Sequence, residues 1–281
     1  MAATDRIAVS SWSLHRLLGV TYPHDLETLE IGPREETFGP AGADLLDLPA
    51  LVAGHGIRRL ELCSFHLPSK DAAYLAELRA AFRSAGVSFQ TLLIDAGDIS
   101  DPETANRDAN WISDWVRVAD KAGAEYARIV AGKQPPTMQA LDLSASMLAM
   151  IADEHAGATV KLATENWFDL LSTPDAVHYL LDKTDGRIEL NGDFGNWSGS
   201  AKYDDLGSIF SRASLCHAKA SFEDGVMSAQ DYGRCVDAAE MAGYRGPYTL
   251  IFDSAAPDEW AGIATERTFI LERISEAVTA D

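Results

Sequence analysis

Three titratable side chains lie at or just past the ends of short β-rich segments in the second half of the chain. They are Glu165, Asp193 and His217. Two carboxylates and an imidazole form an oxygen and nitrogen ligand set that suits a divalent cation such as Mn²⁺, Mg²⁺, Co²⁺ or Zn²⁺. Such a cation polarises a carbonyl or hydroxyl oxygen, and the same carboxylates could transfer protons. We therefore expect a metal or acid–base site here.

Each of these residues also has a purely structural explanation. Glu165 could cap the start of a helix, Asp193 could brace the glycine turn that follows it, and His217 could be a core histidine with satisfied hydrogen bonds. Three such coincidences at equivalent strand positions are less expected than one shared site. The functional interpretation is therefore preferred for the set as a whole.

Further polar and aromatic residues lie near the ends of other β-rich segments. Lys219 is two residues beyond His217, on the same strand face, where its ammonium could hold an oxyanion, a phosphate or a carboxylate. We assign catalytic roles to Glu165, His217 and Lys219. Aromatic rings pack against the C–H faces of sugars, so indoles at this rim favour a ring-shaped organic substrate. The predicted substrate-binding residues are Trp12, His66, Arg128, Trp167 and Trp197.

The elements that must position these residues alternate between short β-rich runs and longer segments of helical periodicity. This alternation is typical of βαβ units around a parallel sheet, and eight such units predict one α/β domain over residues 1–281, a closed (β/α)8 TIM barrel. An open doubly wound sheet would normally carry a glycine-rich phosphate turn, and neither GxGxxG nor GxxxxGK[ST] is present. We expect no nucleotide cofactor. The predicted strands are Ile7–Ser11, Arg59–Cys63, Ser88–Ile94, Tyr126–Val130, Val160–Thr164, Ile188–Asn191, Leu215–Ala218 and Tyr248–Phe252.

A long segment over residues 17–43 departs from this regular spacing. It is acidic and rich in proline and glycine, and loops of this length are uncommon unless they have a function. Because it follows the first strand, it belongs to the end of the barrel that carries the site. Two interpretations stay open, a lid over the site and a solvated insertion without a role.

The amino-acid composition limits the classes of binding partner and the compartment that we expect. A formal net charge of −20 opposes binding to nucleic acid or to an anionic membrane and favours a small-molecule carbohydrate substrate. Three cysteines without a CxxC motif indicate a reducing compartment. The sequence contains neither a signal-peptide pattern nor a membrane-spanning run, so we expect a cytoplasmic protein. Homo-oligomerisation stays open.

The chain resembles the xylose-isomerase-like barrel superfamily, which contains sugar and sugar-phosphate isomerases and epimerases, inosose dehydratases and endonuclease IV. The resemblance rests on the order and spacing of "IAVSSWSLHR", "LELCSFHLPS", "AGAEYARIVAG", "LATENW", "LNGDFGN", "LCHAKAS" and "GYRGPYTLIFD". In the epimerases and isomerases, strands five to eight supply Glu, Asp, His and a second Glu to one divalent metal. Glu165, Asp193 and His217 match the first three, whereas Ile251 occupies the position of the second Glu. Asp253 is the nearest substitute ligand.

The resemblance and the candidate residues lead to three hypotheses. The first is a sugar or cyclitol isomerase or epimerase, in which Glu165 moves a proton next to a carbonyl while a metal or Lys219 stabilises the enediolate. The second is a lyase or dehydratase acting on an oxidised sugar or glycoside, because the second Glu is missing. The third is a non-catalytic sugar-binding barrel that has lost its metal. DNA repair of the endonuclease IV type is disfavoured, since it needs a larger ligand set and a basic face.

Overall fold

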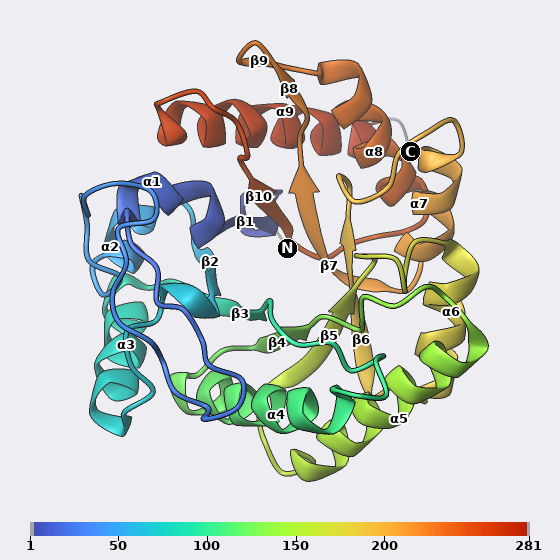
Figure 1. Cartoon of the computed structure of the whole chain (residues 1–281). Coiled ribbons are helices and arrows are strands. Elements are labelled where there is room, and N and C mark those ends of the chain that lie inside the picture. The colour runs from blue at the N-terminus through green and yellow to red at the C-terminus, as the bar shows by residue number, and fades with distance from the viewer. Residues whose placement is uncertain (1–2, 280–281) are drawn as a thin grey trace.

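Eight parallel strands close into a barrel in the computed structural model, which describes residues 3–279 (Figure 1). The strand order around the barrel is β1-β10-β7-β6-β5-β4-β3-β2, so the fold predicted from the sequence is confirmed. The strands are β1 (Ile7–Ser10), β2 (Arg59–Cys63), β3 (Ser88–Ile94), β4 (Tyr126–Ile129), β5 (Lys161–Glu165), β6 (Ile188–Asp193), β7 (Ala213–Lys219) and β10 (Tyr248–Ile251).

The strands that carry the candidate site extend further along the chain at their carboxyl ends than the sequence predicts. β5 ends at Glu165 and β6 at Asp193, because Glu165 pairs with Asn191 and Asp193 pairs with His217. β7 begins two residues before the predicted strand and continues to Lys219, which pairs with Ile251 of β10. The candidate residues are therefore part of the rigid strands rather than of the loops after them.

Helices surround the barrel and cover its strands (Figure 1). In the helix over residues 72–85, Leu75, Leu78 and Phe82 lie on one face and are buried. This helix and the one over residues 105–122 each end at a glycine of positive φ, Gly86 and Gly123. The helices are α1 (His15–Leu18), α2 (Leu48–Gly54), α3 (Ala72–Ala85), α4 (Ala105–Ala122), α5 (Met138–Glu154), α6 (Pro174–Lys183), α7 (Lys202–Phe210), α8 (Ala229–Met241) and α9 (Glu259–Thr279).

Two serines fasten the first strand to its neighbours where the chain leaves the barrel. They belong to η2 (Ser11–Leu14), a short 3₁₀ helix that follows β1. The hydroxyl of Ser13 donates to the carbonyl of Leu250 and accepts from the amide of Phe252. The hydroxyl of Ser11 accepts from the amide of Cys63. These side chains extend the backbone pairing of β1 and help to hold the mouth closed.

The long loop between α1 and α2 packs against α4 and, through Phe38, against Trp12 at the mouth. Two isolated antiparallel bridges, Thr21 with Glu35 and His24 with Ile31, give part of it a hairpin form. In Figure 1 it runs from α1 past α3 to α4, where the ring of His24 contacts Trp111 and Trp115. The loop thus has extensive packing of its own, and its action as a lid stays a prediction.

A small antiparallel hairpin, which the sequence did not predict, follows β7. It consists of β8 (Phe222–Glu223) and β9 (Val226–Met227) and lies near α8 and α9 (Figure 1). The ring of Phe222 packs edge-on against Phe252. The hairpin therefore rests on the segment that leaves β10.

Among residues 3–279, no helix combines the length and the apolar character needed to cross a membrane.

Glu266 of α9 is a buried carboxyl group outside the barrel mouth. Its side chain is fully buried, and burial together with the nearby charge of Asp253 raises the pKa of Glu266 well above its usual value. A carboxyl group whose pKa is raised in the folded state stabilises the fold below its unfolded pKa. As the pH rises above the unfolded pKa, the unfolded state releases the proton that the folded state still holds. Rising pH therefore favours the unfolded state and removes this contribution.

We predict that Glu266→Gln becomes more stable relative to the wild type as the pH rises from 4 to 8. The amide stays neutral at every pH, whereas the buried carboxyl group must hold its proton against a falling proton concentration. Thermal midpoints measured across this range should diverge by about 2–4 °C, which corresponds to about 1 kcal/mol. Glu272→Gln, at an exposed position of the same helix, is the control. A pH-independent difference for Glu266→Gln would contradict the prediction.

Candidate functional site

Glu165, Asp193 and His217 meet at the mouth of the barrel. One ligand atom from each lies within 4.8 Å of the other two. All three side chains are buried, and they come from the adjacent strands β5, β6 and β7. Because neighbouring parallel strands end at the same edge, side chains in matched register point toward a common point. The structure therefore brings together the three residues that the sequence singled out.

The imidazole of His217 lies between carboxylates on both sides. Its Nδ1 is 3.2 Å from Glu165 Oε2 and 3.5 Å from Asp193 Oδ2, and its Nε2 is 3.1 Å from each carboxylate oxygen of Glu61. Burial opposes the charged imidazole, but the negative charges of Glu61 and Glu165 outweigh burial and raise the pKa of His217 well above its usual value. His217 is therefore a cation held by buried carboxylates.

Glu165 is held in its ionised form by a dense set of donors. Its Oε1 accepts from Asn196 Nδ2 at 2.8 Å, and its Oε2 accepts from Asn191 Nδ2 at 3.1 Å. Burial would raise the pKa of Glu165, yet the charges of His217 and Arg128 lower it to about 2. A carboxylate with so low a pKa is a weak base and a ready ligand for a cation.

The sequence missed several asparagines that orient the carboxylates. Asn166 accepts from the amide of Asp193 through Oδ1 and donates to its carbonyl through Nδ2. The amides of Gly195 and Asn196 both donate to Asp193 Oδ1, which leaves Oδ2 facing His217. A sequence signal existed for Asn191, because it lies two residues before Asp193 and therefore on the same strand face.

Arg128 of β4 is buried beside this group. Its Nη2 donates to Asp95 Oδ1 at 2.6 Å, its Nε lies 3.1 Å from Glu165 Oε2, and its guanidinium carbon is 5.2 Å from the ring centre of Trp167. Its Nη1 is buried without a hydrogen-bond partner among the described residues. Arg128 thus neutralises two carboxylates from inside the barrel.

Lys219 and Asp253 form an ion pair at the outer part of the mouth. Lys219 Nζ lies 2.7 Å from Asp253 Oδ2, and the two side chains are 34% and 39% exposed. The stem of Lys219 passes over Gly195, where a Cβ atom would come within 2.8 Å of it. Burial would lower the pKa of Lys219, but the contact with Asp253 raises it, so the ammonium keeps its proton.

The residues converge on a pocket of about 250 Å³. Of the predicted site residues, it is lined by Trp12, Arg128, Glu165, Trp167, Asp193, His217, Lys219 and Asp253. Ile251, Phe65 and Leu93 add apolar surface. The pocket therefore combines two indoles with a cluster of charged groups, an arrangement that suits a small polar ring.

Two predicted substrate-binding residues lie elsewhere. Trp197 is 7% exposed in the hydrophobic core, where its Nε1 donates to the carbonyl of Leu171, and it does not line the mouth. The prediction placed it at the rim because it follows β6, but the turn after Asp193 directs its ring inward. His66 lies in η3 (Ser64–His66) and lines a neighbouring cavity rather than the mouth.

The three-residue group fits a divalent cation. Its donors are two carboxylates and one imidazole nitrogen, all buried and within reach of one ion. Glu61 accepts a hydrogen bond from Nε2 of His217, so Nδ1 of the same ring faces Glu165 and Asp193. Asp253 was predicted as a fourth ligand, but its carboxylate pairs with Lys219 and is not part of this group. Three protein ligands leave coordination positions open for substrate or water.

A family model described as xylose isomerase-like TIM barrel matches residues 49–268. No curated protein sequence matches the chain. A solved xylose isomerase-like TIM barrel protein from Mycobacterium smegmatis, in complex with magnesium, has a TM-score of 0.70 at 18% identity and covers 99% of both chains.

Two solved epimerases have similar folds. L-ribulose 3-epimerase has a TM-score of 0.69 at 17% identity, with 97% of both chains covered. The 3-keto-D-glucoside 4-epimerase of E. coli has a TM-score of 0.64 at 14% identity, with 83% of this chain and 97% of that chain covered. At these identities the similarity concerns the fold.

We predict that Glu61→Gln weakens the binding of Mn²⁺ by about 10–100-fold. Glu61 faces His217 Nε2, and partners that orient a ligating imidazole typically contribute this much to metal affinity. Titration of chelator-treated protein with Mn²⁺, followed by electron paramagnetic resonance, measures the dissociation constant. Affinity should also fall as the pH falls, because an ion near Nδ1 must displace the proton of the imidazolium.

The matched control is Glu125→Gln, which changes an exposed carboxylate paired with Arg59. It should leave Mn²⁺ affinity unchanged. Equal affinities for the wild type and Glu61→Gln would show that Glu61 does not orient His217 toward a cation.

Proposed function

Because the chain belongs to the xylose isomerase-like TIM barrel family, we propose that it isomerises or epimerises a neutral sugar or cyclitol by proton transfer next to a carbonyl. One observation carries this proposal. The Glu165–Asp193–His217 group faces the same pocket as the Lys219–Asp253 pair and the indoles of Trp12 and Trp167. Groups suited to hold a cation, to exchange protons and to contact a sugar ring thus surround one small volume.

The buried group and the outer pair have different chemical roles. Glu165, Asp193 and His217 would hold a divalent cation, which when bound supplies Lewis acidity at a carbonyl or hydroxyl oxygen. Glu165 is 4% exposed, has a pKa of about 2 and contacts both Arg128 and His217, so it is poorly suited to accept a proton from carbon. The shuttle role that the sequence suggested for Glu165 therefore passes to another carboxylate.

Asp253 is the carboxylate best placed to act as the base. It is 39% exposed, lines the pocket and contacts Lys219, which stays protonated. Asp253 would remove the proton from the carbon next to the carbonyl, and the electron pair would move into an enediolate. The ammonium of Lys219 would donate hydrogen bonds to its oxygens.

Ile251 helps to distinguish isomerisation by one base from epimerisation by two bases. Its side chain lines the pocket where the related isomerases and epimerases carry a second Glu, and it can neither accept nor return a proton. A single base would deliver the proton to the adjacent carbon on the face from which it was removed, while the hydroxyl proton moves to the former carbonyl oxygen. This moves a carbonyl between adjacent carbons without inverting a centre, so the residue set favours isomerisation over two-base epimerisation.

Elimination is the second candidate function, and the same pair of residues supports it. Asp253 could remove the α-proton while the ammonium of Lys219, 2.7 Å away, donates a proton to a departing hydroxyl or alkoxyl group. The products distinguish the two reactions. Isomerisation conserves the mass of the sugar, whereas elimination releases water or an aglycone.

We predict that the protein exchanges a carbon-bound proton of a free ketose or a keto-cyclitol with solvent, and that Asp253→Asn slows this exchange about 100-fold or more. A general base contributes about this much to a proton transfer. Incubation in D₂O with Mn²⁺, followed by NMR and mass spectrometry, measures the label and the product mass. Asp204→Asn, an exposed substitution on α7, should retain the wild-type rate.

Other outcomes of this experiment contradict the proposal in identifiable ways. Loss of water or an aglycone would establish a lyase. Saturable binding without exchange, with or without Mn²⁺, would establish a sugar-binding barrel. Equal exchange by the wild type and Asp253→Asn would exclude Asp253 as the base.

The charges at the mouth predict a preference for unphosphorylated substrates. Arg128 pairs with Asp95 and Glu165, Lys219 pairs with Asp253, and His217 contacts Glu61, so every cation here already has an anionic partner. Five carboxylates share these three cations, so a phosphate dianion would meet a net negative charge. We expect kcat/KM for a free sugar to exceed that for its phosphate ester by at least about tenfold. A preference for the ester would contradict this charge assignment.

A further inference from the structure

Two indoles line the barrel mouth from opposite sides. Trp12 follows β1 and Trp167 follows β5, and both line the pocket at the mouth. In the closed strand order, β10, β7 and β6 separate β1 from β5 on one side, and β2, β3 and β4 separate them on the other. The pocket therefore lies between two aromatic walls. A ring bound there meets an indole on each side, and the gap between the indoles limits which rings fit.

The two indoles are held in different ways. Trp167 lies against the barrel's own charged group, with its ring centre 5.2 Å from the guanidinium carbon of Arg128. Trp12 stacks on His15, with ring centres 4.7 Å apart and an interplanar angle of 28°. Both rings of this stacked pair contact Phe38 of the long loop. The centre of the Phe38 ring lies 5.9 Å from that of Trp12, in an edge-on arrangement, and 4.4 Å from that of His15.

The backbone around Phe38 is fastened to the end of α1. The amide of Phe38 donates to the carbonyl of Gly19, and the amide of Gly42 donates to the carbonyl of Leu17, each at 2.9 Å. Gly19 has a φ of +72°, and a Cβ atom there would come within 2.6 Å of the carbonyl oxygen of Gly39. The two ends of the loop are therefore in direct backbone contact, which holds Phe38 at a defined place beside the indole.

The loop also contacts a second aromatic residue on this side of the mouth. The amide of Tyr22 donates to the carbonyl of Phe65 at 2.7 Å. Phe65 lines the pocket and packs edge-on against Trp12, with ring centres 6.3 Å apart. The loop thus supplies one aromatic neighbour of Trp12 and is bonded to the backbone of another.

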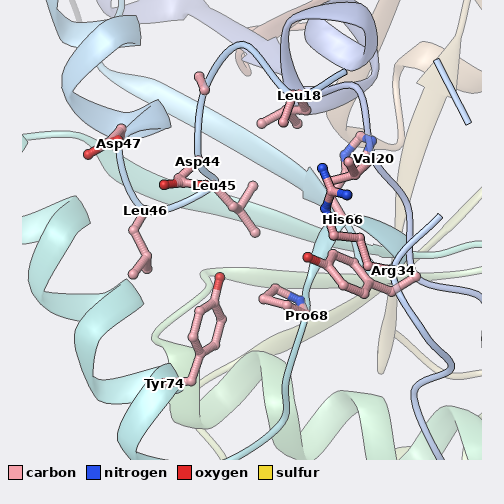
Figure 2. Close-up of a pocket in the computed structure, with 13 residues that line it drawn as sticks. Leu18, Val20, Arg34, Asp44, Leu45, Leu46, Asp47, His66, Pro68 and Tyr74 are labelled. Atoms are coloured by element: carbon pink, nitrogen blue, oxygen red, sulfur yellow. The ribbon is translucent and has the colours of Figure 1, made fainter. Parts of the chain in front are cut away.

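Elsewhere the loop is anchored independently of the mouth. The ring of His24 contacts two indoles of α4. A cavity of about 400 Å³ lies between the loop and α3, with Val20 and Arg34 of the loop on one side and Tyr74 of α3 on the other (Figure 2). The loop therefore has an anchor away from the mouth, and a substitution of Phe38 leaves that anchor intact.

We propose that Phe38 is a positioning residue that holds the indole of Trp12 opposite Trp167 and so sets which rings the mouth accepts. Phe38 does not line the pocket itself, so it acts through Trp12. The long loop thereby forms an outer support for one wall of the site. The role in substrate choice rests on the proposed function, since it requires a sugar ring at the mouth, whereas the hold on Trp12 does not.

The first test needs no ligand. The chain has six tryptophans, and the Nε1–H signal of Trp12 in a ¹⁵N–¹H correlation spectrum of the full chain is identified by its loss in Trp12→Phe. ¹⁵N relaxation of this group should give an order parameter near the rigid value of about 0.85 in the wild type and below about 0.6 in Phe38→Ala. Phe38→Tyr keeps the ring and should keep Trp12 rigid. Phe269→Ala removes a half-buried ring of α9 that contacts Tyr232, and as the matched control it should leave Trp12 unchanged.

The second test measures sugar binding at the mouth. Titration with D-glucose, D-fructose and myo-inositol, followed by the Trp12 signal, gives dissociation constants. At least one of these sugars should bind to the wild type, and Phe38→Ala should weaken it about three- to tenfold, the value of one aromatic contact. Phe38→Tyr should restore the affinity. For a sugar that exchanges a proton with solvent, KM should rise by the same factor while kcat stays within about twofold, because Phe38 acts on binding alone.

Each result decides part of the proposal. An indole of Trp12 that is equally rigid in the wild type and in Phe38→Ala, with both proteins folded by circular dichroism, would overturn it. A mobile Trp12 in Phe38→Ala with unchanged sugar affinity would overturn the role in substrate choice. The absence of sugar binding to the wild type would contradict the proposed function and that role together, and the order parameters would then still support or overturn the hold of Phe38 on Trp12.

Discussion

The contacts of His217 with Glu61, Glu165 and Asp193 are the interactions on which the rest of the site depends. Buried carboxylates are costly unless a cation neutralises them, by several kcal/mol for each uncompensated ion. His217 extends from β7 across the barrel to Glu61 on β2, a strand that is not its neighbour in the sheet. Arg128 supplies a second cation from β4. The imidazolium and the guanidinium thus allow the barrel mouth to concentrate negative charge in its interior.

This charge balance also gives the site its chemical character. The proton on the His217 imidazolium lies where a divalent cation could replace it, between Glu165 and Asp193. The asparagines around the carboxylates fix their oxygens before any ligand arrives, which lowers the cost of reorganisation during a reaction. The outer pair of Lys219 and Asp253 is more exposed and less constrained, as expected of groups that exchange protons with a substrate.

The sequence predicted the barrel and its central group because both depend on periodic signals. Eight alternating units specify the fold, and matched strand ends bring Glu165, Asp193 and His217 together. The sequence could not predict the partners from distant segments, such as Glu61 opposite His217 or Lys219 beside Asp253, because these depend on barrel closure and side-chain rotamers. Trp197 was misplaced for the same reason. A residue after a strand can turn toward the mouth or into the core, and periodicity does not distinguish the two.

The central claim is that Glu165, Asp193 and His217 form a site for one divalent cation. Its most direct test is elemental analysis of wild-type protein and Asp193→Asn, both purified without chelator. Our account predicts about one divalent ion per chain in the wild type and its loss in Asp193→Asn, with both proteins folded by circular dichroism. A folded wild type that stays free of metal when dialysed against Mn²⁺, Mg²⁺, Co²⁺ and Zn²⁺, or equal metal content in the variant, would contradict it.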